Sequence, residues 1–160
     1  MTNQNQLAVK IVLDAWFSNV KRTDEIFNKL TDEELMNEIA PGKNRVIYLL
    51  GHLTAVHDRM LPLLNLEDRA YPQLDDIFLT SPDKTVTEIP SAINLRAFWK
   101  GTNEKLEEHF NKVQADEWFQ KHSSVSAEDF VKEPHRNRLN VVLGRTNHLS
   151  YHLGQLAFVK

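Results

Sequence analysis

Cysteine is absent from this chain of 160 residues. Without cysteine there is neither a disulfide nor a Cys-based zinc site, so any thiol chemistry must use a thiol supplied from outside the protein. The absence also fits a reducing cytoplasm. No hydrophobic run approaches 18 residues, and the first residues show no basic start followed by an apolar segment. We therefore expect a soluble, unexported protein of the cytoplasm that has no membrane-spanning helix.

An excess of positive charge is also lacking. The net charge is −3 and the isoelectric point is near 6.2, and lysine and arginine are scattered, which disfavours nucleic acid as a partner. There is no Gly-rich phosphate loop, no Gly-x-Ser-x-Gly elbow and no His-Glu-x-x-His motif. These absences argue against nucleotide-dependent transfer, α/β-hydrolase chemistry and ordinary zinc-protease chemistry.

Apolar residues recur at three- and four-residue steps in four separate stretches of the chain. With 41% hydrophobic residues, the chain fits one domain over residues 1–160 with a sizeable core. The periodicity predicts an all-α fold, an antiparallel four-helix bundle. Thr31, Ser91 and Ser126 have the spacing of helix N-caps, and Pro62 is expected to end the second helix. The predicted helices lie near 6–30, 44–61, 91–113 and 137–159.

The segment 63–90 breaks this periodicity and forms a long crossover between the second and third helices. Three of its residues are prolines, at positions 72, 82 and 90, and it carries several acidic side chains. A structureless loop of this length is unusual inside a compact domain. Leu74, Ile77, Phe78 and Leu79 indicate that part of it packs down as a helical turn. The crossover either covers a face of the bundle or acts as a lid over a pocket.

Two histidines lie one helical turn apart near the end of the chain. Residues four apart have Cβ atoms about 5–6 Å from each other on one helix face, so His148 and His152 can reach one cation through Zn–N bonds of about 2.0–2.1 Å. His52, in another apolar-periodic segment, is the best candidate for a third ligand. The spacing alone leaves a second interpretation open, because histidines at this interval also occur by chance on surfaces or in cores.

The other histidines have less specific surroundings. His57 is about 140° around the helix from His52, so we expect a hydrogen-bonded packing residue there, and His109 is expected to be exposed. At the predicted mouth of the bundle, His135, Arg136 and Arg138 are either solvated or contact an anionic group of a substrate.

The residues next to the histidine pair include one candidate for positioning a ligand. Gln155 projects within about 20° of His148 on the last helix, whereas Tyr151 and Asn147 project away from it. No side chain besides the histidines stands out as a general acid or base.

The step Gly51-His52-Leu53, together with His148, His152, Gly154 and Gln155, resembles the DinB-like family of four-helix-bundle metalloproteins. The resemblance extends over nearly the whole chain and is weakest between Pro62 and Pro90. It implies that the three histidines bind one divalent metal, commonly zinc or nickel, in an open site. It also implies a possible homodimer and the use of small thiols such as bacillithiol, mycothiol or glutathione.

These features lead to competing functional hypotheses. The first is a metal-dependent transferase or isomerase that uses an exogenous low-molecular-weight thiol and an electrophile as substrates. The second is a metal-dependent hydrolase of esters or amides. A third is a stress-associated metal-binding protein without turnover, and the last is a helical interaction module whose histidines coincide by chance.

Overall fold

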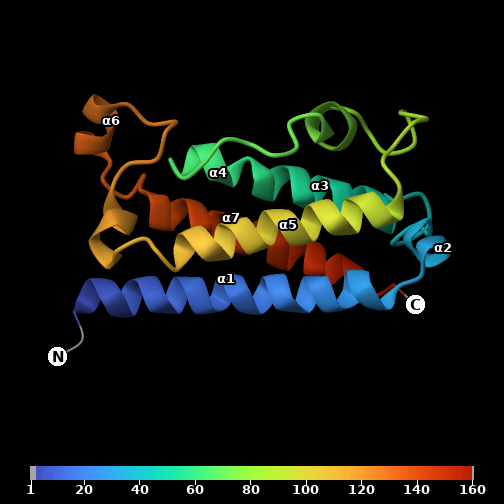
Figure 1. The fold of residues 1–160 in the computed structure, drawn as a ribbon, viewed down its shortest axis with the longest axis horizontal. Helices are drawn as coiled ribbons and strands as arrows, with labels where there is room; N and C mark the ends of the chain where they lie inside the picture. Colours follow the sequence, from blue (N-terminus) through green and yellow to red (C-terminus); the bar gives the residue numbers. More distant parts are fainter. Residues whose placement is uncertain (1–2, 160) are drawn as a thin grey trace.

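The computed structural model describes residues 3–159, and helices form its framework (Figure 1). Within that range no strand is present, and no helix is both long enough and apolar enough to cross a membrane. Two further turns have other geometries, the π-helical η1 (Asp76–Thr80) and the 3₁₀ turn η2 (Ala115–Phe119). The α-helices are α1 (Gln4–Lys29), α2 (Asp32–Leu35), α3 (Val46–Asp58), α4 (Met60–Leu63), α5 (Ala92–Phe110), α6 (Ala127–Lys132) and α7 (Arg138–Leu156).

The four long elements form the bundle that the periodicity predicted. In Figure 1, α1 and α7 run in one direction, and α3 and α5 run in the opposite direction. The crossover after α4 brings the chain back along the bundle to the start of α5. This return explains its length, because a short loop can only join antiparallel neighbours. The predicted all-α four-helix bundle with a long crossover between its second and third helices is confirmed.

Helix starts follow the expected capping chemistry. The side chains of Thr31, Ser91 and Ser126 each accept a hydrogen bond from a backbone N–H of the first turn of α2, α5 and α6. Such a cap satisfies one of the N–H groups that have no partner inside the helix. Asn137 caps α7 in the same way, which fixes where the helix that carries two of the histidines begins.

The second bundle helix ends earlier than predicted. It was expected to run to about residue 61 and stop at Pro62, but α3 ends at Asp58 and the short α4 follows after Arg59. Pro62 lies in the first turn of α4, where its missing N–H leaves no helical bond unmade. The break coincides with Asp58, whose carboxylate accepts hydrogen bonds from the backbone N–H groups of residues 70 and 71 at 2.8 and 3.1 Å.

A buried ionic network fastens the crossover to α3. The Asp58 carboxylate is fully buried and pairs with Arg69 at 3.0 Å. Arg69 also binds Asp75, which pairs with Arg59 in turn. Because removal of one partner from a buried ion pair typically costs about 3–5 kcal/mol, this network holds the crossover firmly in place.

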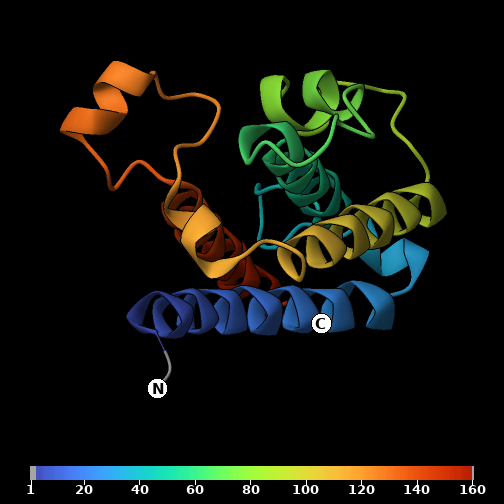
Figure 2. The same ribbon diagram turned by 60° about the vertical axis from the view of Figure 1, so that its left-hand side comes forward.

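The crossover packs down as predicted. Leu74 and Phe78 are buried, and the expected helical turn is η1. Figure 2 shows the crossover lying along α3, on the side of that helix away from α1. As a result η1 lies directly beside the middle of α3, where His52 is located.

Candidate metal centre

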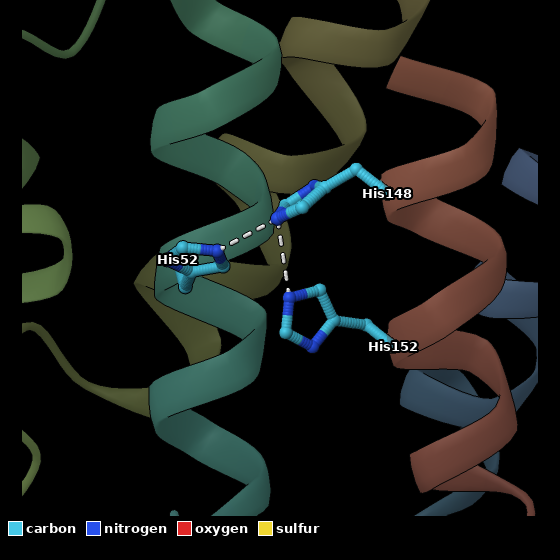
Figure 3. Close-up of side chains that lie close together, drawn as sticks. All are labelled: His52, His148 and His152. Carbon is cyan, nitrogen blue, oxygen red and sulfur yellow. Dashed lines mark hydrogen bonds between the residues drawn. The ribbon is translucent and has the colours of Figure 1, made fainter. Parts of the chain in front are cut away.

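The structure brings the three predicted histidines together. His52 projects from α3 toward His148 and His152, which project from α7 (Figure 3). The Nε2 atom of His148 lies 3.2 Å from Nε2 of His52 and 3.2 Å from Nε2 of His152. All three side chains are half-buried, so the cluster lies at the edge of the core, as their positions beside apolar rows predicted.

Hydrogen bonds on the far side of two rings fix their orientation. Nδ1 of His52 lies 3.0 Å from the backbone carbonyl oxygen of Phe78 in η1, and Nδ1 of His152 lies 2.7 Å from Oε1 of Gln155. Since both oxygens can only accept, each Nδ1 carries the proton and each Nε2 presents its lone pair to the cluster. The position of Gln155 beside a histidine agrees with the prediction. The Phe78 carbonyl was not foreseen.

This donor set fits a divalent cation. Three nitrogens bound to one tetrahedral ion at about 2.0–2.1 Å lie about 3.3–3.4 Å from one another, close to the two observed separations of 3.2 Å. Nδ1 of His148 is buried and has no hydrogen-bond partner among the described residues. No contact therefore fixes the tautomer of His148, and the proton can be on Nδ1 or on Nε2. A proton on its Nε2 can be shared with the other two rings, and a cation can replace that proton. The cluster can therefore hold a metal ion.

The protein keeps these imidazoles neutral at physiological pH. Burial lowers the pKa of His148 to about 4, and the nearby charges of His152, His52 and Arg145 act in the same direction. Burial likewise lowers the pKa of His52 and of His152, although their hydrogen bonds to Phe78 and Gln155 oppose it. A neutral imidazole is the form that binds a metal, so the cluster needs no deprotonation at pH 7.

The family model of the DinB superfamily matches residues 18–156 of this sequence. The chain belongs to the DinB superfamily. This DinB-superfamily chain also shares its fold with a crystal structure described as a conserved protein of locus from Enterococcus faecalis, with a TM-score of 0.61 and 17% sequence identity. The match covers 99% of this chain and 96% of that one, and at this identity it shows the fold alone. No curated protein matches the sequence.

The remaining histidines of this DinB-superfamily protein lie outside the cluster. His57 is a packing residue, as predicted, because its ring lies between Trp16 and Trp99 with centroid distances of 4.7 and 5.0 Å, and Nδ1 lies 2.8 Å from Oδ1 of Asn103. His109 was expected to be exposed. Instead it is half-buried, and its Nε2 lies 3.0 Å from a carboxylate oxygen of Glu67 in the crossover.

His57 makes the stability of the fold depend on pH. Burial lowers its pKa to about 3, whereas the unfolded chain takes up a proton near the ordinary value of about 6.5. Below pH 6.5 the unfolded state therefore binds one more proton than the folded state, and stability falls as the pH falls. The slope for this one group is about 1.4 kcal/mol per pH unit. Urea unfolding of the metal-free protein from pH 7.5 to 4.5 measures the total loss, to which the three cluster histidines also contribute because their pKa values are lowered too.

His57→Gln is the comparison that isolates this effect. The variant should be less stable than the wild type at pH 7.5, because an aromatic ring is lost between two indoles. The difference in stability between the two proteins should shrink below pH 6.5, because only the wild type has a histidine at position 57 that gains a proton on unfolding. Carboxylates that begin to titrate at the acid end of this window do so in both proteins, so their contribution cancels in the difference. A difference in stability that stays constant from pH 7.5 to 4.5 contradicts the assignment.

Proposed function

We propose that this DinB-superfamily protein binds one divalent metal ion, zinc or nickel, through His52, His148 and His152. We further propose that it catalyses transfer or isomerisation of an electrophile with an exogenous small thiol. The observation that carries the proposal is the convergence of three neutral Nε2 atoms. Three protein ligands leave a coordination position open, which is typical of catalytic rather than structural sites, and imidazole suits both zinc and nickel.

The chain's own residues orient the centre and shield it. The Phe78 carbonyl and Gln155 hold two of the rings with Nε2 inward. Tyr48 stacks on His52 at a centroid distance of 6.3 Å, and its hydroxyl donates to the carbonyl of Ser81 at 2.8 Å. Tyr48 and η1 therefore both pack against His52 on the α3 side of the cluster. A divalent ion at such a site supplies the means to deprotonate a coordinating thiol at neutral pH.

The family resemblance favours a thiol as nucleophile, and the surroundings of the cluster are compatible with one. Within residues 3–159, the group of possible ligand side chains at the cluster consists of the three histidines and includes no carboxylate, so no carboxylate base lies among them. A thiol that binds in its deprotonated form needs no such base. Because the chain has no cysteine, the thiol must be a separate small molecule of the bacillithiol, mycothiol or glutathione kind.

Cobalt substitution tests the proposal. Addition of bacillithiol, mycothiol, glutathione or coenzyme A to the cobalt-loaded protein should produce a sulfur-to-metal charge-transfer band. His152→Ala should abolish the band, and His135→Ala, which changes an exposed histidine, should retain it. The same panel is then assayed with model electrophiles, beside ester and amide substrates. No band and no metal-dependent thiol turnover would favour a hydrolase, or a metal-binding protein without turnover.

A homodimer in the cytoplasm forms part of the proposal. The family resemblance supports pairing, and α1 exposes Leu7 and Ile11 to 53% and 61%, so this helix offers an apolar surface free of the histidines. Light scattering should then give about twice the 18.6 kDa of one chain. A mass of one chain over a wide concentration range contradicts the dimer and leaves the metal proposal untouched.

Gln155 provides a test of the outer hydrogen bonds. Gln155→Leu removes the oxygen that accepts from Nδ1 of His152, so the ring loses its preferred tautomer and orientation. Loss of such a partner typically weakens metal binding by about 10–100-fold. Competition with a chromogenic chelator measures the affinity, and Gln73→Leu, an exposed position, is the matched control. Equal affinity in the two variants contradicts the role of Gln155.

A further inference from the structure

Two arginines lie on the same face of α7 as His148 and His152, nearer to the start of the helix. Arg145 precedes His152 by seven residues, and Arg138 precedes Arg145 by another seven. Seven residues rotate the helix position by only about 20°, and Arg145 is also three residues before His148. The two arginines and the two histidines therefore lie along one stripe of α7.

Neither arginine of this stripe has an ionic partner within the described residues. The other arginines, apart from the exposed Arg22, all form ion pairs. Arg145 is half-buried and makes no side-chain hydrogen bond, and Nε of Arg138 is buried without a partner. A buried charge is normally paired, because its desolvation is costly. The lack of a protein partner points to a partner from solution.

Other positively charged groups lie near Arg145. Its charge helps to lower the pKa of His52 and of His148, and its own pKa is lowered first by burial and then by Arg59. A divalent ion held by the histidines adds two further positive charges. The unpaired guanidinium of Arg145, together with the charge of such an ion, would stabilise an anionic ligand.

We propose that Arg145, assisted by Arg138, binds a carboxylate group of the small molecule that reaches the three-histidine centre. The planar guanidinium matches a carboxylate in two parallel hydrogen bonds, which adds both strength and direction. The inference rests on the proposed function for the identity of the ligand as a thiol, and it narrows that ligand to carboxylate-bearing thiols. Arg145 acts as a specificity residue that positions the ligand.

A pair of nearly isosteric thiols tests this inference. The cobalt-loaded protein is titrated with 3-mercaptopropionate and with 3-mercaptopropionamide, and the ratio of their dissociation constants is taken from the charge-transfer band. The wild type should bind the acid at least about 10-fold more tightly, the size of one charge-assisted hydrogen bond. Arg145→Gln should bring the ratio close to one, and Arg138→Gln should reduce it less. Arg22→Gln removes the same charge from the exposed surface of α1 and should leave the ratio unchanged.

Two further arms keep the outcome decisive. Arg145→Lys preserves the positive charge but cannot donate two parallel hydrogen bonds, so it should keep part of the preference for the acid over the amide. Elemental analysis confirms the metal content of every variant. Equal binding of acid and amide by the wild type, or a ratio unchanged in the Gln and Lys variants, overturns the inference. If no thiol gives a band, the proposed function fails, and propionate against propionamide is measured by the visible cobalt spectrum instead. Failure of propionate to bind then overturns the role of Arg145 as well.

Discussion

Replacement of His148 with alanine is expected to abolish stoichiometric metal binding. Its Nε2 is the central atom of the cluster, 3.2 Å from the Nε2 atoms of both His52 and His152, so the variant keeps two imidazoles and a void between them. The affinity should fall by more than the roughly 10–100-fold that loss of an outer hydrogen-bond partner causes. Elemental analysis of the purified protein and chelator competition measure the loss.

Thermal unfolding gives an independent readout of the same variant. A metal that binds only the folded state raises the unfolding temperature, and a metal that binds more tightly raises it further, so added zinc should stabilise the wild type and leave His148→Ala nearly unchanged. His135→Ala, at an exposed position, controls for histidine loss in general. Full metal occupancy in the single alanine variants of all three histidines would show that the metal binds elsewhere.

Replacement of Gly51 with alanine should damage both the fold and the site. A Cβ at this position would clash with three ring atoms of Phe78, whose side chain is only 1% exposed. Alanine is more favourable than glycine in a helix by about 1 kcal/mol. The buried ring of Phe78, however, cannot move aside without moving η1. Overpacking of this kind typically costs about 1–3 kcal/mol. Because the Phe78 carbonyl orients His52, metal affinity should fall as well.

Gly144→Ala is the matched control for this substitution. Gly144 is also helical, and a Cβ there meets nothing within 4 Å, so the variant should be as stable as the wild type or more stable. Urea unfolding and chelator competition are compared for the two alanine variants. In Gly51→Ala combined with Phe78→Ala the clash is relieved at the expense of core packing. Gly51→Ala with wild-type stability and metal affinity contradicts the close approach of η1 to α3.

The parts of this protein that were predictable depend on local sequence. Helical periodicity and the caps at Thr31, Ser91 and Ser126 involve residues within one or two turns of each other, so the sequence itself specifies them. The pairing of His148 with His152 is equally local, because a spacing of four residues sets their separation on any helix. Gln155 follows from the same helix geometry.

The assembly of the site was partly predictable for a different reason. His52 was placed with the pair because it borders a second apolar row, and burial of both rows in one core brings their edges together. The family resemblance implies that the three histidines bind a metal, a question that the spacing alone leaves open. What the sequence determined by itself was therefore the set of helices and the candidate ligands.

Tertiary structure decided which groups surround those ligands. The early end of α3 depends on a contact between Asp58 and the crossover, and the half-burial of His109 depends on Glu67, 42 residues away in sequence. The group that orients His52 is a backbone carbonyl. Every residue has one, so the identity of the side chain at position 78 could not predict this contact. Whether Arg145 has a partner is likewise a property of distance in space. Such long-range contacts leave no periodic trace in the sequence, and only the folded chain shows them.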